Sequence, residues 1–318
     1  MSYTSRTGRR PSEYASKSSH SHIINDPAIK DFLTHCNYPS AAEEVTLDKQ
    51  LVYKVKDIDS NPIKNVIAID GGRQEVPVRK EFPSSVLTFF QFGALYFSIA
   101  DLESLYINPF IEPSEISKLK EIQRYKFILP TKNIKTTEDD TLIKSIRRTL
   151  HIFFITPQAG GDKFIDSLKW FLFEEYASKP TGWMLAWCPS CHFRDIELTG
   201  AKMKQDYSFE CPNPKCKENI YLTETFRLHE IIDDELGASG IIGYLGSVLE
   251  QMVLIHLIRI ILNTKPSLLN EIIFIKDGQL AFYGQTANLH KPMRKLVNYL
   301  FDNHNLYLVG LEKSGAFV

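Results

Sequence analysis

The chain has 318 residues and a formal net charge of −1, with 43% hydrophobic and 24% charged residues. This is the balance of a globular protein long enough to bury a sizeable core, and it excludes a protein whose whole surface is basic and attracts nucleic acid. The longest apolar run, residues 252–262, carries His256 and Arg259 and is well short of the roughly 20 residues that cross a bilayer. Because the first residues also lack an apolar signal segment, we expect a cytoplasmic protein without a membrane partner.

The first half of the chain begins with residues 1–22, which are rich in polar and cationic side chains. This composition predicts a flexible tail, and the alternative is a segment that becomes ordered on a partner or on DNA. Hydrophobic spacing and turn residues predict the elements that follow. These are a short helix at 26–36, an extended stretch at 51–58, a buried strand at 66–70 that stops at the turn Gly71-Gly72, and one or two strands within 85–99.

In the second half, apolar residues recur three and four positions apart, which predicts helices. The predicted elements are helices at 141–154 and 164–176, a long helix at 241–262, a strand and turn at 271–280, a helix at 291–301 and a last strand at 306–315. The alternation of strands and helices favours an α/β fold with a mixed sheet flanked by helices.

Four of the five cysteines stand in two close pairs with nineteen residues between them. The pairs are Cys188 with Cys191 and Cys211 with Cys216. Such short loops let two thiolates reach one ion, so the spacing predicts a structural zinc ribbon at 187–221, whose closed four-thiolate site leaves no position for catalysis. We expect residues 193–199 and 207–210 to pair as a hairpin inside it, and His192 to be a bystander.

Three acidic residues are candidates for catalysis. Asp70 and Asp277 each end a predicted strand and precede a glycine, although Asp-Gly is also a common turn dipeptide. Glu250 lies in an almost wholly apolar helix, where a buried carboxylate is costly unless it is paired or binds a cation. The alternative is that Glu250 lies at an exposed edge of that helix. Three carboxylates that meet at a sheet edge are typical of a site for one or two Mg²⁺ or Mn²⁺ ions.

The chain resembles the NurA family, nucleases that work with the HerA hexameric ATPase, in four stretches. They are I-A-I-D-G-G at Asp70, L-G-A-S-G-I-I-G-Y-L-G-S-V-L-E-Q-M at Glu250, I-F-I-K-D-G-Q-L-A-F at Asp277 and L-V-G-L-E-K-S-G at Lys313. The second and third stretches are the more specific ones, and the resemblance reaches over most of the chain from about residue 60 onward. The four-cysteine segment is similar to an insertion seen in some bacterial members.

The resemblance implies an RNase H-like core, Mn²⁺- or Mg²⁺-dependent exo- or endonuclease cleavage of DNA, a homodimer and a HerA-type partner. By position, Asp70, Glu250 and Asp277 match the metal-binding carboxylates, and Lys313 matches a lysine near the scissile phosphate. A late histidine of the family has no equivalent before Val318. The sequence stops inside or just after the last predicted strand without a closing element, so we expect that the natural chain continues or that the rest was not resolved. The implied domains are a tail at 1–22, a nuclease domain formed by 23–186 and 222–318, and the ribbon at 187–221.

The predicted function is hydrolysis of DNA phosphodiesters together with the ATPase, in DNA end processing and repair or in defence against phage. The alternative from another class is an inactive zinc-ribbon adaptor that docks DNA onto the ATPase. The carboxylates favour the nuclease, whereas the missing histidine favours the adaptor. An RNA nuclease of the same fold also stays open.

Overall fold

The computed structural model describes residues 25–37, 44, 46, 60–79, 81, 84–103, 120–158, 160–177, 179–216 and 218–312. The chain divides into two units, Met1–Asp59 and Ser60–Val318. In the first unit, helix α2 (Pro27–Thr34) is the predicted short helix, and Asp26 caps it by accepting a hydrogen bond from the Ala28 N–H at 2.8 Å. The predicted tail at 1–22 and the extended stretch at 51–58 lie outside the described residues.

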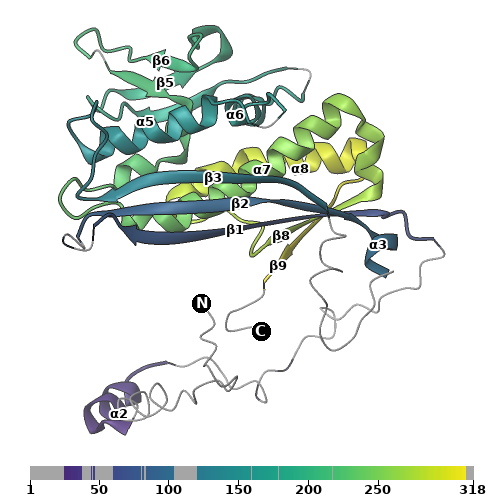
Figure 1. Cartoon of the computed structure of the whole chain (residues 1–318), viewed down its shortest axis with the longest axis horizontal. Helices are drawn as coiled ribbons and strands as arrows, with labels where there is room; N and C mark the ends of the chain where they lie inside the picture. Colours follow the sequence, from purple (N-terminus) through teal and green to yellow (C-terminus); the bar gives the residue numbers. More distant parts are fainter. Residues whose placement is uncertain are drawn as a thin grey trace. The chain divides into compact units, whose positions relative to one another are not determined.

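The second unit is built on a five-stranded mixed sheet with the strand order β3-β2-β1-β8-β9 (Figure 1). Its strands are β1 (Asn65–Pro77), β2 (Val86–Ser98), β3 (Lys120–Lys132), β8 (Ile272–Asp277) and β9 (Tyr307–Leu311). The first three strands pair antiparallel to one another, whereas β8 lies parallel to β1 and β9 lies parallel to β8. The sheet confirms the predicted α/β class, and its central strand β1 is the one that carries Asp70.

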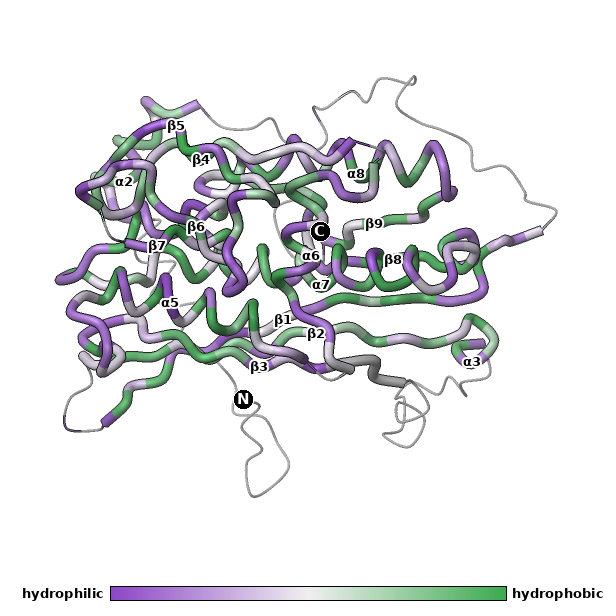
Figure 2. The backbone as a smooth tube through the Cα atoms, turned by 90° about the horizontal axis from the view of Figure 1, so that it is seen from above, coloured by the Kyte–Doolittle hydropathy of each residue, from purple (hydrophilic) through white to green (hydrophobic). Residues whose placement is uncertain are grey.

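The long helices of this unit lie on one side of the sheet (Figure 1). They are α5 (Leu142–Ile155), α6 (Phe164–Leu172), α7 (Ile242–Thr264) and α8 (His290–His304), and a short helix α3 (Ile99–Glu103) follows β2. Helix α7 contacts β1 and β2, α5 contacts β3, and α6 contacts α7. Along α5 and α8, hydrophilic and hydrophobic residues alternate in Figure 2, as expected for helices with one side on the core.

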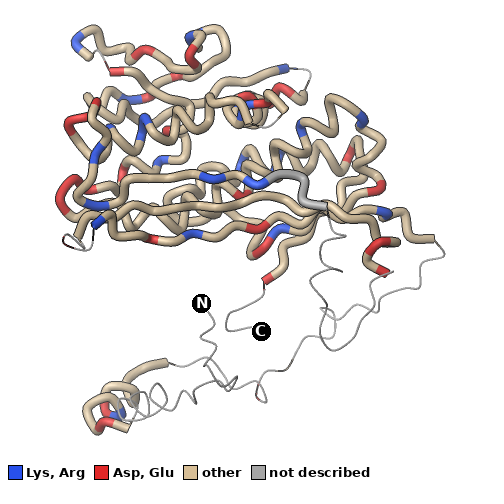
Figure 3. The backbone as a smooth tube through the Cα atoms, viewed as in Figure 1, with Lys and Arg blue, Asp and Glu red and all other residues tan. Residues whose placement is uncertain are grey.

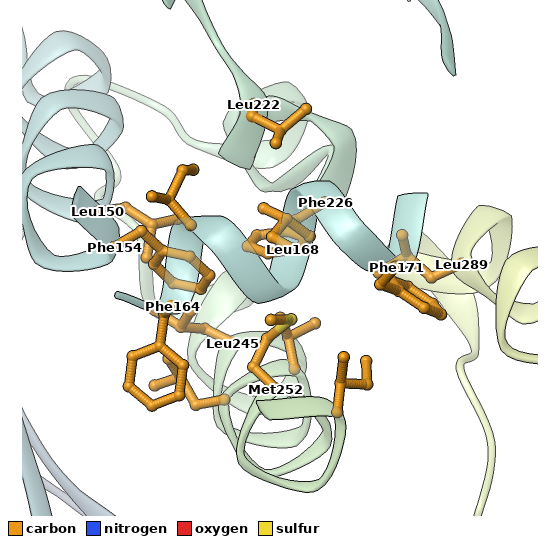
Figure 4. Close-up of a cluster of buried hydrophobic side chains, with 14 of the residues drawn as sticks. Leu150, Phe154, Phe164, Leu168, Phe171, Leu222, Phe226, Leu245, Met252 and Leu289 are labelled. Atoms are coloured by element: carbon orange, nitrogen blue, oxygen red, sulfur yellow. The ribbon is translucent and has the colours of Figure 1, made fainter. Parts of the chain in front are cut away.

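The core of the helical layer is made of large side chains that point toward one another in Figure 4. They come from α5, α6, α7 and a short 3-10 helix, η4 (Leu222–Phe226), and the labelled ones include Leu150, Phe154, Phe164, Leu168, Phe226, Leu245 and Met252. All of them are buried. The burial of so many apolar groups packs α5, α6 and η4 against α7.

Most predicted elements are present with boundaries shifted by a few residues. The predicted strands within 85–99, at 271–280 and at 306–315 are β2, β8 and β9, and the predicted helices are α5 to α8. Helix α6 ends at Leu172, earlier than the predicted end at residue 176. The reason is local, because Glu174 adopts a positive φ of 53° that a continuing helix does not allow.

The prediction that a strand stops at Gly71-Gly72 is wrong, because β1 continues to Pro77 and pairs with β2 over its whole length. Neither glycine has a positive φ. A Cβ at Gly71 would lie 3.0 Å from the Cβ of Phe92 and 3.1 Å from Oε1 of Glu250. Gly71 therefore allows a close approach of α7 to the sheet and does not make a turn.

Strand β3 is absent from the sequence prediction, although its residues alternate in the way that predicts a strand. Tyr125, Phe127 and Leu129 are buried, whereas Lys126 and Ile128 between them are exposed. This alternation is the signature of a strand with one covered face.

The residues Ser239–Thr264, which comprise α7 and the turn before it, are long and apolar enough to cross a membrane by length and composition. The expectation from residues 252–262 alone, that the apolar run is too short to cross a bilayer, is therefore corrected. In the fold, 61% of the most apolar window of this helix is buried inside the protein, where α7 contacts β1, β2 and α6. Its apolar character is accounted for by its position as the core helix.

The close approach at Gly71 can be tested with two neighbouring glycines. Gly71→Ala is expected to lower the free energy of unfolding by about 1–3 kcal/mol, because the new methyl group must displace Phe92 or Glu250. Gly72→Ala is the matched control, since a Cβ there meets no atom within 4 Å, and it leaves the stability unchanged or raises it by about 0.5 kcal/mol. Urea denaturation measures both, and equal stabilities would contradict the packing of α7 on β1.

Candidate active site and metal centre

Two parallel strands bring the predicted aspartates to neighbouring positions. Ile69 of β1 pairs with Lys276 of β8, so the residues that follow, Asp70 and Asp277, stand next to each other where β8 ends. Gly278 then turns the chain away with a positive φ of 73°, which glycine adopts without strain. Asp277 is thus at a strand end, as predicted, whereas Asp70 lies in the middle of β1.

Glu250 reaches the same edge from helix α7. Its Oε2 lies 2.8 Å from Nζ of Lys276, whose side chain is 3% exposed, and the side chain of Glu250 itself is 15% exposed. The same Nζ donates a hydrogen bond to the carbonyl oxygen of Asp277 at 2.5 Å. Glu250 therefore does not lie at an exposed edge of the helix. It is paired, as a carboxylate on an apolar helix has to be.

The three carboxylates are close enough to influence one another. Burial raises the pKa of Glu250 above its ordinary value, and the hydrogen bond and positive charge of Lys276 oppose that shift. The negative charges of Asp70 and Asp277 raise the same pKa further. A site with this concentration of negative charge favours cations.

The side chains of Asp70 and Glu250 nevertheless lie on different faces of the sheet. Gly71 faces α7 and Glu250, and neighbouring residues of a strand alternate, so Asp70 faces away from the helices. There it lines a surface cavity of about 490 Å³ together with Arg124, which stands two strands away across Gly93.

A second cavity, of about 560 Å³, opens on the helix side of the same edge. It is lined by Glu250, Asp277 and Lys276, and also by Arg73 and Ser247. Sequence reasoning missed both basic residues. Lys276 could have been found by alternation, because it continues the row of buried residues of β8 that faces α7.

The structure does not gather the three carboxylates in one coordination sphere. Across the part of the chain that is described, the only group of three or more His, Cys, Asp or Glu residues with ligand atoms within 4.8 Å of one another is formed by cysteines. Glu250 and Asp277 are oxygen donors of the kind that Mg²⁺ and Mn²⁺ take, and they share a cavity, but Lys276 holds Glu250. Lys313 lies outside the described residues.

The cysteine segment forms two hairpins, each with one cysteine pair in its turn. The first pair lies between β4 (Trp183–Trp187) and β5 (Arg194–Leu198), and the second lies between β6 (Ser208–Glu210) and β7 (Asn219–Tyr221). The prediction that residues 193–199 pair with 207–210 is wrong, because each segment pairs within its own hairpin. The observed pairing places one cysteine pair in each turn, which lets the two pairs come together.

The four sulfur atoms are arranged as ligands of one metal ion. Cys188 Sγ lies 3.9 Å from Cys216 Sγ, and Cys191 Sγ lies 3.5 Å from Cys211 Sγ. A tetrahedron of thiolates around zinc has sulfur–sulfur edges of about 3.8 Å, since each zinc–sulfur bond is about 2.3 Å. His192 is exposed and is no part of this cluster, in agreement with its expected role as a bystander.

The thiols differ in how readily they lose a proton. A hydrogen bond from the Phe193 backbone lowers the pKa of Cys191 to about 6, whereas burial raises the pKa of Cys211 to about 12. A bound cation supplies the positive charge that four converging thiolates need. The four cysteines can therefore hold a structural metal such as zinc.

The ribbon is held onto helix α5 by buried polar groups. The Arg147 guanidinium donates hydrogen bonds to Glu224 Oε1 at 2.6 Å and to the Asn219 carbonyl oxygen at 2.9 Å. The ring of His151, also on α5, stacks on Tyr221 with centroids 4.1 Å apart. Because Asn219 and Tyr221 belong to β7, these contacts join the cysteine segment to the helical layer.

No protein-family model, curated protein or solved structure matches the chain.

The cysteine cluster predicts the metal content of the purified protein. We expect one zinc ion per chain, and Cys211→Ser is expected to lose the zinc and to unfold at a lower temperature, because a structural zinc contributes directly to folding. Cys36→Ser is the matched control, since Cys36 lies outside the cluster. Elemental analysis measures the outcome, and a zinc-free wild-type protein of normal stability would contradict the assignment.

Proposed function

We propose that the chain is a metal-dependent DNA nuclease of the NurA kind, which cuts DNA delivered by a HerA-type hexameric ATPase. The observation that carries the proposal is the acidic edge at the end of β8. There Glu250, from a buried helix, shares a cavity with Asp277, and the charges of both Asp70 and Asp277 act on Glu250. Carboxylates that act on one another beside a cavity, one of them on an otherwise apolar helix, are typical of functional sites.

The topology supports an RNase H-like core. The sheet has three antiparallel strands, β1 to β3, followed by two strands parallel to β1, in the order β3-β2-β1-β8-β9. An RNase H-like sheet has this order and these directions, with acidic residues on the first strand, on the fourth strand and on a helix. Asp70, Asp277 and Glu250 stand on β1, on β8 and on α7.

In this proposal, Glu250 and Asp277 hold Mn²⁺ or Mg²⁺ in the cavity that both residues line, and Asp70, on the other face of the sheet, adds its negative charge to the site. When bound, such an ion activates a water molecule and neutralises charge on the scissile phosphate. The basic side chain of Arg73, in the same cavity, binds and orients the phosphate. By the resemblance, Lys313 adds a further positive charge.

Several parts of the proposal rest on the resemblance to the NurA family. These are the homodimer and the biological setting, which is either DNA repair or defence against phage. The ribbon binds zinc and has a structural role, because all four of its ligand positions are filled by cysteine.

The charge distribution explains why a delivering partner is needed. The net charge is −1, and basic and acidic residues are interspersed along the chain in Figure 3. A protein without a basic surface gains little from the release of counterions by DNA, so it binds DNA weakly on its own. A translocating ATPase overcomes this by bringing DNA to the site.

One observation favours a second candidate, the inactive zinc-ribbon adaptor. The ion pair with Lys276 satisfies Glu250 without any metal ion. In an adaptor this pair is permanent, and the protein does not respond to Mn²⁺.

Cleavage of labelled linear and circular DNA with Mn²⁺, with and without the ATPase, tests the proposal. We expect the wild-type chain to cleave, and Asp277→Ala and Glu250→Gln to lower the rate about 100-fold or more, because each removes an oxygen ligand. Glu235→Gln is the matched control with unchanged activity, since Glu235 is an exposed acidic residue outside both cavities. Equal rates for the wild type and Asp277→Ala would contradict the site. An inert wild type in the presence of the partner would support the adaptor.

A further inference from the structure

Lys276 lies beside Glu250 and Asp277 at the end of β8 but has no role in the proposed reaction. The residues of β8 that face α7 are Ile272, Phe274 and Lys276, and all three are buried. The first two are apolar side chains that pack under the helix. A lysine in the third position is costly to bury, so its charge must be balanced locally.

The ammonium group is balanced by two acceptors. Glu250 Oε2 lies 2.8 Å from Nζ, and the carbonyl oxygen of Asp277 accepts a hydrogen bond from the same Nζ at 2.5 Å. The same cavity also contains Arg73. Glu312 lines it as well, so that with Asp70 four negative and two positive side chains lie near this edge.

A divalent cation at this edge must compete with Lys276. An ion that is coordinated by Glu250 needs the carboxylate oxygen that Nζ now holds, and it repels the ammonium group. Lys276 keeps the carbonyl oxygen of Asp277 as a second acceptor, so it can leave Glu250 without losing every partner. After the exchange the ammonium group therefore still has a hydrogen-bond acceptor.

We infer that Lys276 is a built-in counter-ion of the metal site, which holds Glu250 in place when no divalent ion is bound and is displaced from it when Mn²⁺ binds. The metal-binding half of this inference rests on the proposed nuclease function, whereas the counter-ion half does not. In this arrangement Lys276 is a positioning residue that weakens the affinity for metal and keeps the empty site folded.

Lys276→Met tests both halves in the full chain, with its zinc content measured so that the ribbon stays loaded. Without added Mn²⁺, we expect this variant to melt at a lower temperature than the wild type, because Glu250 is left unpaired. It should bind Mn²⁺ about tenfold more tightly or better, and Mn²⁺ should raise its melting temperature more than that of the wild type. Lys265→Met is the matched control, because Lys265 is an exposed lysine just after α7, and it should behave as the wild type.

The double variant Glu250→Gln/Lys276→Met keeps the test decisive if Lys276→Met alone does not fold. The double variant removes both charges, so it should melt closer to the wild type than Lys276→Met does and should not respond to Mn²⁺. If the changes in melting temperature caused by Glu250→Gln and by Lys276→Met add up in the double variant, Lys276 is not the counter-ion of Glu250. If Lys276→Met binds Mn²⁺ no more tightly than the wild type, the displacement is wrong.

The two proposals can fail separately. Coupled stabilities and tighter Mn²⁺ binding in a chain that cuts no DNA would support the counter-ion and overturn the nuclease. DNA cleavage by the wild type, together with additive changes in the melting temperatures of the variants, would support the nuclease and overturn the counter-ion.

Discussion

The ion pair between Glu250 and Lys276 joins the core helix to the central part of the sheet, and the arrangement of the acidic edge depends on it. Helix α7 carries Glu250 into the protein because its other residues are apolar and pack on β1, β2 and α6. The carboxylate needs a partner there, and breaking such a buried pair costs about 3–5 kcal/mol. Gly71 leaves the space in which the pair forms, since any Cβ at this position would press on Glu250. The position of α7, the small size of Gly71 and the charge of Lys276 therefore depend on one another.

The cysteine cluster of the ribbon and the acidic edge belong to the same structural unit but offer different kinds of ligand. Four cysteines in two hairpin turns form a closed set of soft ligands, which is suited to stability and not to catalysis. Arg147 of α5, which is paired with Glu224 of η4, also donates a hydrogen bond to the Asn219 carbonyl oxygen and so fixes the ribbon to α5. The acidic edge has hard oxygen ligands, an open cavity and charges that are not fully balanced, which are the properties expected of a place where chemistry occurs.

The sequence predicts the parts of this architecture that depend on local patterns. Apolar spacing located helix α7 with Glu250, and the cysteine spacing located the ribbon, because both signals lie within short segments. The strand through Gly71 was misjudged, since its course depends on pairing with β2 along its whole length. The pairing of Glu250 with Lys276 joins residues from two separate elements, so no local pattern reveals it. Asp70 and Glu250 lie on different faces of the sheet because side chains alternate along β1 and Gly71 is the residue that faces α7.

We propose, above all, that the end of β8 is a site for a divalent cation that takes Glu250 from Lys276. Anomalous scattering at the manganese absorption edge, from crystals grown with Mn²⁺, locates such an ion directly. The account predicts a manganese peak in contact with the carboxylates of Glu250 and Asp277, and Nζ of Lys276 moved away from Glu250. An edge without manganese, with Lys276 still bonded to Glu250 at a Mn²⁺ concentration that supports DNA cleavage, would contradict it.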